Sequence, residues 1–383
     1  MPTSLRVLLR NGSDSDQVYA YITGIALQHG GRRCILKADG QGLYFPENPR
    51  AICSPLTEDC AILLGPPGNA VETTIPQLAG GRIWFSRGKK LTFLLNPGPA
   101  LVEPSVLNRS DPNANVDFGF CEFTLDNAQL YANISYVDFV PRLPIAISLR
   151  RASGAVQTVG GMDPSGMERI AQGLYEQAQK DGRRWDKLVV KRNGEILRVL
   201  SPMHGQGVGA SFRGYYEPYV DKVWEHYLER QRRPPGYRGK PLVIDTQSAP
   251  GKLAAEFGED GTVRIGGELF GKPSTADILG CNSGPFATGP SPTRNAIIPR
   301  LAAAFARTAL LLSDDQPSVP STFYEQDPTN HYARLVHMHN AESKGYAFAY
   351  DDVQRNDSLD MSGKVNAGDP VLFTVTVGGT PAG

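Results

Sequence analysis

The sequence has no apolar run long enough to cross a membrane and no excess of either charge. None of its 383 residues falls in an apolar stretch near the roughly 20 residues of a transmembrane helix. The opening MPTSLRVLLRNGSD has too short an apolar stretch for a signal peptide. Lys plus Arg and Asp plus Glu each total 39, whereas nucleic-acid binding needs a basic face. We therefore expect no membrane and no nucleic-acid partner.

Metal-binding spacings are also absent from the sequence. The five cysteines form no CxxC pair and no His/Cys ligand pattern: Cys34, Cys53, Cys60, Cys121 and Cys281. An odd number leaves at least one thiol free, and the spacing leaves open a short bridge between Cys53 and Cys60. No HExxH occurs. We expect no metal ion and no organic cofactor.

Three histidines cluster in a segment with helical spacing: His331, His337 and His339. His337 and His339 lie two positions apart, so they point to different sides of a helix, which argues against zinc. We interpret the cluster as structural or hydrogen-bonding. His331 or His337 stays a candidate for contact with a substrate hydroxyl.

Two further short patterns are interpreted as loops and turns. HGQGVGAS (204–211) resembles a glycine-rich nucleotide loop, but Ser201-Pro202 separates it from the preceding strand pattern and no clean helix follows. We expect a loop that lines a cleft with close backbone approach. Asp351 and Asp352 follow an alternating run and are expected at a turn or a strand edge rather than around calcium.

Residues 1–160 have the pattern of an all-β region. Short alternating apolar runs recur, and Pro, Gly, Asn and Asp separate them. Many short strands at such spacing favour a β-sandwich or a β-barrel. The runs occupy residues 5–10, 17–27, 32–38, 60–65, 72–78, 81–88, 90–96, 116–124 and 129–140.

After residue 160 the pattern indicates helices as well as strands. Apolar side chains recur every three or four positions in four segments, which predicts amphipathic helices. Asn193-Gly194 is a strong two-residue turn signal between two short strands. The helices are expected at 163–182, 217–233, 294–313 and 327–343, and short strands at 242–270.

Strand character returns in residues 345–377, in GYAFAYDDV and then DPVLFTVTVGG. The order is therefore β-rich, mixed, then β-rich. The most economical architecture is an α+β protein of two domains. A β-barrel or sandwich of residues 1–160 is completed by 345–383, and a mixed α/β domain of 161–344 is inserted. We expect a substrate cleft where the two domains meet.

Two acids lie inside neighbouring strand-like runs, Glu122 in 116–124 and Asp138 in 129–140. A polar turn near residues 126–129 separates the runs, so a hairpin would place the two strands side by side. Side chains on one face of adjacent strands lie close together.

Most glycosidases use a pair of carboxyl groups for catalysis. One carboxyl group protonates the leaving oxygen, and the other attacks the sugar or activates water. Taken alone, a Glu and an Asp 16 residues apart in sequence are weak evidence, and the pattern by itself favours two solvated acids at strand edges.

A resemblance over most of the chain favours the catalytic interpretation. Seven segments carry it: DQVYAYITG (16–24), RIWFSRGKKLTF (82–93), DPNANVDFGFCEFTLDNAQLYANISYVDF (111–139), LRVLSPMHG (197–205), DKVWEHY (221–227), NHYARLVH (330–337) and KGYAFAYDDV (344–353). On these segments the chain resembles glycoside hydrolase family 64. Members of that family are endo-β-1,3-glucanases that release laminari-oligosaccharides, chiefly the pentaose.

The resemblance implies roles for named residues. Glu122 in CEFTL matches the general acid of the family, with Cys121 in place of a small polar residue. Asp138 in YVDFV matches the general base, and members of the family invert the anomeric centre. Thr124 and Asp126 fall in the sugar-contacting turn, although relatives often have Asn at the position of Asp126.

The resemblance implies further that Tyr131 stacks near the same sugars. It implies that Cys281 is unpaired, because the position of its partner in bacterial relatives is Ala302 here. It also implies a thaumatin-like β-barrel joined to a mixed α/β domain, with a wide groove between them for a β-1,3-glucan.

The partner expected on this basis is a β-1,3-glucan polysaccharide, bound by a monomer. The substrate implies an extracellular location. Two alternatives stay open. One is a non-catalytic, β-glucan-binding thaumatin-like protein, and the other is a hydrolase of a different β-glucan.

Overall fold

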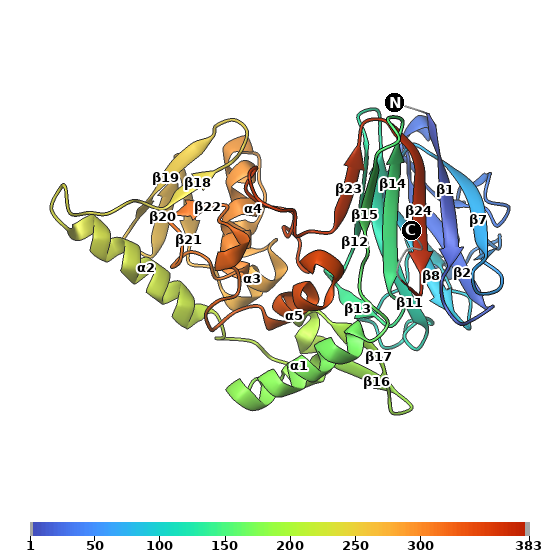
Figure 1. Ribbon diagram of the computed structural model, residues 1–383, viewed down its shortest axis with the longest axis horizontal. Helices are drawn as coiled ribbons and strands as arrows, with labels where there is room; N and C mark the ends of the chain where they lie inside the picture. The colour runs from blue at the N-terminus through green and yellow to red at the C-terminus, as the bar shows by residue number, and fades with distance from the viewer. Residues whose placement is uncertain (1–2, 380–383) are drawn as a thin grey trace.

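Two β-sheets packed face to face form one half of the molecule in the computed structural model, which describes residues 3–379 (Figure 1). The larger sheet has the strand order β23-β12-β11-β8-β2-β3-β4, and β6 pairs with β2. Its strands are β2 (Val18–Ala26), β3 (Arg32–Leu36), β4 (Leu43–Tyr44), β6 (Ile62–Leu63), β8 (Leu78–Arg87), β11 (Asp117–Leu125), β12 (Leu130–Ile134) and β23 (Lys364–Ala367).

The second sheet of this half has the strand order β15-β14-β24-β1-β7. Its strands are β1 (Ser4–Asn11), β7 (Ala70–Pro76), β14 (Ile145–Arg151), β15 (Val156–Val159) and β24 (Pro370–Val377). A short three-stranded sheet is added by β5 (Ser54–Pro55), β9 (Leu94–Asn96) and β10 (Ala100–Val102).

The alternation of side chains along each strand builds the core between the two large sheets. Leu5, Val7 and Leu9 of β1 are buried, and the residues between them are more exposed. Along β11, Cys121 and Phe123 are buried in the same way. Because successive strand residues point to opposite faces, the neighbours of Cys121 and Phe123 must lie on the other face of the larger sheet.

The other half of the molecule combines a five-stranded sheet with helices (Figure 1). The sheet has the order β21-β20-β19-β18-β22. The strands of this sheet are β18 (Val243–Asp245), β19 (Lys252–Phe257), β20 (Thr262–Ile265), β21 (Glu268–Gly271) and β22 (Asp315–Gln316). The helices of this half are α2 (Glu217–Arg232), α3 (Thr275–Gly280) and α4 (Pro292–Ala306).

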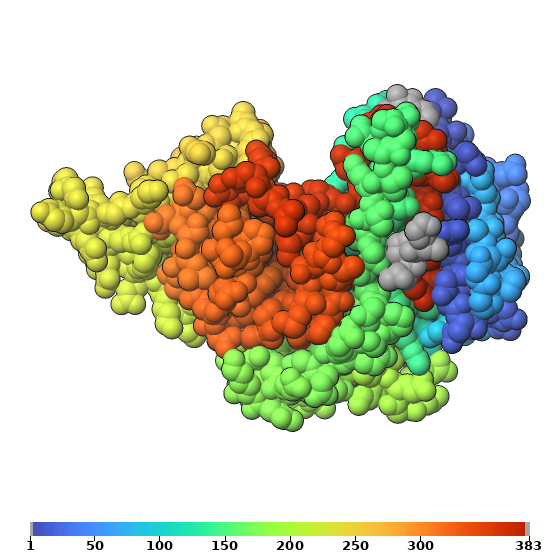
Figure 2. Space-filling model, viewed as in Figure 1, coloured from blue at the N-terminus to red at the C-terminus, as the bar shows by residue number. Residues whose placement is uncertain are grey.

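A third group of elements connects the two halves at the bottom of Figure 1. It contains β13 (Phe139–Pro141), α1 (Gly166–Asp181), β16 (Val189–Arg192), β17 (Glu195–Leu200) and α5 (His331–His339). The predicted Asn193-Gly194 hairpin is confirmed, since β16 and β17 pair there. The space-filling view shows a notch at the top of the molecule, between the sheet-rich half and the mixed half (Figure 2).

The last strand returns to the centre of the first half. β24 lies between β1 and β14, parallel to β1 and antiparallel to β14. The domain limits 1–160 with 345–383, and 161–344, stay a proposal. The pairing of Phe139 with Leu200 joins residues from both sides of position 160 in one small sheet.

Two sequence-based expectations were wrong in detail, and one open question is answered. Residues 346–353 form turns, not a strand. The helix expected at 294–313 ends at Ala306, because Thr308 adopts a positive φ of 53° that no helix continues through. The bridge left open between Cys53 and Cys60 does not form, and all five cysteines are free thiols.

A buried ionic cluster anchors the 346–353 turns to the mixed half. Nη2 of Arg307 donates to Oδ1 of Asp351 at 3.0 Å, and Nε2 of His337 lies 3.0 Å from Oδ2. The amide of Ala347 also donates to Asp351. Burial works against charge here, but His337 and Arg307 outweigh it and lower the pKa of Asp351. The interpretation of Asp351 as a turn residue is confirmed.

Substitution Asp351→Asn is expected to lower the free energy of unfolding by about 3 kcal/mol or more, because it leaves the buried charge of Arg307 without its partner. A lowered folded-state pKa contributes stability above the unfolded pKa of the carboxyl group, and the contribution is lost as the pH falls through the lowered value. The difference in the free energy of unfolding between Asp351→Asn and the wild type should therefore become smaller as the pH falls. Urea unfolding at neutral and acidic pH measures it.

Asp357→Asn is the matched control, since Asp357 pairs with Arg355 on the surface, with 65% of its side chain exposed. An exposed pair contributes about 0–1 kcal/mol. Equal destabilisation by the two substitutions would contradict a special role for Asp351.

Candidate active site

The predicted hairpin that carries Glu122 is confirmed. β11 and β12 pair antiparallel, with Glu122 opposite Asn133 and Thr124 opposite Tyr131. Since Cys121 and Phe123 point into the core, Glu122 and Thr124 emerge on the outer face of the larger sheet.

A row of polar residues crosses this face at the level of Glu122. On the other side of β11, Glu122 pairs with Arg82 of β8, and Arg82 pairs in turn with Thr23 of β2. Nε of Arg82 donates to Oε1 of Glu122 at 3.1 Å. Nη1 of the same guanidinium donates to Oε2 of Glu103 at 2.9 Å. One arginine thus joins two carboxylates.

The position of Arg82 is fixed by its surroundings. Its guanidinium carbon lies 4.8 Å from the ring centroid of Phe120 and 5.4 Å from that of Trp84. Nε1 of Trp84 donates to Oγ1 of Thr23 at 3.1 Å, and that hydroxyl donates to Glu103 at 2.9 Å. Buried aromatic rings below and hydrogen bonds at the sides leave the guanidinium little freedom.

The single strand expected over residues 129–140 is interrupted, and this changes the position of Asp138. β12 ends at Ile134, and Asp138 lies on a bend before β13. The two acids therefore do not sit on paired strands. The bend is held by the small sheet, in which Phe139 pairs with Leu200 and the amide of Ser201 donates to the carbonyl of Asp138 at 2.9 Å.

His204 completes the surroundings of Asp138. A 3-10 segment, Pro202–Val208, starts directly after Ser201, so its first turn returns towards the bend. Nε2 of His204 lies 2.8 Å from Oδ1 of Asp138. This hydrogen bond, with the nearby charges of His204 and Arg82, lowers the pKa of Asp138 despite burial. Because Arg82 acts on Asp138 and bonds Glu122, both acids belong to one electrostatic cluster.

The structure brings three of the five predicted site residues into one cavity. A recess of about 320 Å³ is lined by Arg33, Gly80, Gly81, Arg82, Glu103, Glu122, Phe123, Thr124, Tyr131 and Asn133. The hydroxyl of Tyr131 donates to Oδ2 of Asp352 at 3.3 Å. Burial and the charge of Asp352 raise the pKa of Tyr131, so the phenol keeps its proton.

Asp126 lies apart from these residues. Its Oδ1 accepts hydrogen bonds from the amides of Ala128 and Gln129, at 2.8 and 2.9 Å, which stabilises the turn between β11 and β12. It lines a separate recess with Leu27, Gln28, Gln77, Asn127 and Ala128.

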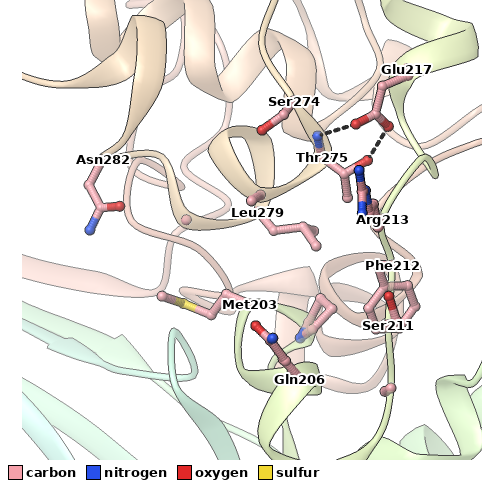
Figure 3. Close-up of a pocket in the computed structure, with 14 residues that line it drawn as sticks. Met203, Gln206, Ser211, Phe212, Arg213, Glu217, Ser274, Thr275, Leu279 and Asn282 are labelled. Carbon is pink, nitrogen blue, oxygen red and sulfur yellow. Dashed lines mark hydrogen bonds between the residues drawn. The ribbon is translucent and has the colours of Figure 1, made fainter.

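A larger pocket, of about 680 Å³, lies against the other side of the Pro202–Val208 segment (Figure 3). Met203 and Gln206 line it from that segment, and Leu279 and Asn282 face them from α3 and beyond. Its one carboxylate, Glu217, accepts hydrogen bonds from the amide and hydroxyl of Thr275 (Figure 3). The pocket therefore offers shape and hydrogen bonds rather than a pair of reactive acids.

The other histidines singled out by the sequence make structural contacts. His337 belongs to the buried cluster with Asp351, and its Nδ1 lies 2.9 Å from the carbonyl of Ser343. His331 packs edge-on against Trp185, and burial lowers its pKa to about 4. Neither lines the recess that holds Glu122. Over residues 3–379 no group of three or more His, Cys, Asp or Glu could hold a metal ion, and no helix there is long and apolar enough to cross a membrane.

Three residues that contact Glu122, Asp138 or their partners were not identified from the sequence: Arg82, Glu103 and His204. Arg82 and His204 stand inside quoted segments of the family resemblance, so a signal was present without a role. Glu103 carries no local signal, since it follows the short strand β10 and reaches Arg82 only through tertiary structure.

The fold matches solved β-1,3-glucanases. A laminaripentaose-producing β-1,3-glucanase, solved in complex with laminaritetraose, superposes with a TM-score of 0.84 at 29% identity, over 98% of this chain and 99% of that one. A β-1,3-glucanase domain from Clostridium beijerinckii gives a TM-score of 0.73 at 21% identity, over 98% of each chain, which shows the fold alone.

Two curated sequence relatives are also enzymes that act on β-1,3-glucan. A glucan endo-1,3-beta-glucosidase of Cellulosimicrobium cellulans is 32% identical over 322 residues, covering 82% of this chain and 56% of that protein. One from Arthrobacter sp. (strain YCWD3) is 32% identical over 316 residues, covering 80% and 55%. The chain thus spans little more than half the length of these relatives.

The class defined by fold and relatives is the glycoside hydrolases. The family model described as Beta-1,3-glucanase, that of glycoside hydrolase family 64, matches residues 3–377. The chain belongs to this family.

Substitution His204→Leu is expected to raise the pKa of Asp138, because the hydrogen bond from His204 is the largest influence that lowers it. The measurement is an NMR titration of the aspartate carboxyl carbons, with Asp138 assigned through Asp138→Asn. His29→Leu, at an exposed histidine in another part of the sheet-rich half, is the control. An unchanged Asp138 titration in His204→Leu would refute the link.

Proposed function

We propose that this chain is an inverting endo-β-1,3-glucanase that hydrolyses laminarin and curdlan to short oligosaccharides such as laminaripentaose. Glu122 is the general acid and Asp138 the general base. The observation that carries the proposal is the grouping of the two acids: Arg82 bonds Glu122, and His204, with a smaller contribution from Arg82, lowers the pKa of Asp138. Family membership and the relative solved with laminaritetraose support the substrate class.

The proposed reaction needs only the two acids and a water molecule. Glu122 donates its proton to the departing O3 of the glucan. Asp138, kept ionised by the hydrogen bond from His204, takes a proton from the water that attacks the opposite face of the sugar. The anionic Asp138 also stabilises the positive charge that develops on the sugar in the transition state.

The bound glucan is proposed to run through a wide groove between a thaumatin-like sheet-rich half and the mixed half, along the notch visible in Figure 2. Thr124 and Tyr131 would contact the sugars next to Glu122. We also propose that the enzyme acts outside the cell, where its substrate occurs, and as a monomer. Light scattering during gel filtration tests the last point, and a dimer mass would contradict it.

Glu122→Gln and Asp138→Asn are each expected to lower kcat on laminarin by about 10²-fold or more, because general acid–base steps contribute 10²–10⁴-fold. Product release is followed by chromatography, and NMR of the new anomeric centre should show the α-anomer first. Glu195→Gln, which alters an exposed carboxylate paired with Arg142, is the control and should keep wild-type activity.

A β-anomer formed first would mean retention and would remove Asp138 from the role of base. Tight binding to curdlan without any product would indicate the alternative, a non-catalytic glucan-binding protein. Rapid cleavage of another β-glucan, with laminarin left intact, would change the substrate.

Tyr131→Ala is expected to raise KM for laminari-oligosaccharides about tenfold or more, since losing one aromatic sugar contact costs on the order of 1–2 kcal/mol. Asp126→Ala should change KM less, because Asp126 stabilises the turn and lines a different recess. Steady-state kinetics on both variants, with folding checked by circular dichroism, measures the two changes in KM. A larger effect of Asp126→Ala would place the sugars along the turn instead.

A further inference from the structure

One arginine stands among three carboxyl groups at the candidate site. Arg82 bonds Glu122 and Glu103 directly, and its charge also acts on Asp138. His204 also acts on Asp138, but the two carboxylates in contact with Arg82 share its single positive charge. Repulsion among neighbouring carboxylates favours a proton on one of them. Which carboxyl group holds that proton depends on how the charge of Arg82 is divided.

Glu103 makes the shortest contact with Arg82, and Glu122 makes two longer ones. Oε2 of Glu103 accepts from Nη1 at 2.9 Å, against 3.1 Å for both contacts of the guanidinium with Glu122. The side chain of Glu103 is 21% exposed and that of Glu122 is 34% exposed. The other oxygen of Glu103 accepts a hydrogen bond from Thr23, whose hydroxyl is itself held by Trp84. These bonds fix the position of the Glu103 carboxylate beside Arg82.

We propose that Glu103 is a positioning residue that draws the guanidinium of Arg82 towards itself and so leaves Glu122 able to keep the proton that it donates to the glucan. The idea rests on the proposed function, in which Glu122 is the general acid. Without the negative charge of Glu103, Arg82 would contact Glu122 as its one directly bonded carboxylate. It would then stabilise Glu122 in the ionised form, which has no proton to donate to the glucan.

The other charged or titratable groups around Glu122 come from several elements. Arg33 of β3 and Tyr131 of β12 line the same recess. Asp352 bonds Tyr131, Lys364 of β23 pairs in register with Asn133, and Asp138 and His204 lie on the bend and the 3-10 segment. None of these groups bonds Arg82. Among residues 3–379, Glu103 is the one carboxylate that competes with Glu122 for Arg82 by direct contact.

The test is the pH dependence of kcat/KM for Glu103→Gln on laminarin. Gln keeps the size of the side chain and an accepting oxygen but removes the charge. The alkaline limb of the profile reports loss of the proton from the general acid. It should move to lower pH by about one unit, since an opposite charge at hydrogen-bond distance shifts a carboxyl group by that order or more.

Arg82→Gln should move the alkaline limb in the opposite direction, because it removes the positive charge and leaves the negative ones. Glu72→Gln is the matched control: Glu72 bonds Arg6 through both oxygens on the exposed side of β1 and β7. Its profile should coincide with that of the wild type. A merely structural role of Glu103 would lower the rate without moving the limb.

An NMR titration of the Glu122 carboxyl carbon, assigned through Glu122→Gln, gives the same information without turnover. Coincident limbs and coincident titrations in wild type and Glu103→Gln would overturn the positioning role, whether or not the rate falls. If the wild type released no product from glucans, the proposed function would fail. The titration would still decide whether Glu103 controls Glu122.

Discussion

The placement of one charge, the guanidinium of Arg82, is the constraint on which the site depends. It stands on a strand at the centre of the larger sheet, over the rings of Trp84 and Phe120, and it contacts Glu103 and Glu122. Partly buried ion pairs add little net stability. Their value here is positional, because side chains with so few alternative conformations fix the geometry of the candidate site.

Much of the local structure could be predicted because its causes are local. The polar turn near residues 126–129 predicted the hairpin of β11 with β12, and the alternation along β11 puts Glu122 and Thr124 on one face. The Asn193-Gly194 turn and the helices α1 and α2 followed from equally short-range signals. The strand that carries the candidate acid Glu122 was thus predicted correctly.

The other parts depend on contacts between distant residues. Asp138 was assigned to a strand because its neighbours favour one, yet pairing of Phe139 with Leu200 pulls the chain away from β12. That same pairing delivers His204 to the acid, 66 residues further along. Residues 346–353 alternate like a strand, but the buried carboxylate of Asp351 organises them as turns around Arg307 and His337. The local sequence pattern does not indicate contacts with residues that are distant in the sequence.

The position of β24 has a consequence for how the chain acquires its structure. The strand formed by residues 370–377 occupies the middle of the second sheet, between β1 and β14. During synthesis, β1 and β14 cannot be joined until residues 370–377 have emerged, and until then the edges of both strands stay unpaired. Such long-range closure is slow and exposes the chain to aggregation. The elements of the mixed half, from α2 to β22, are continuous in sequence and precede β24, so completion of the second sheet is expected to be a late step of folding.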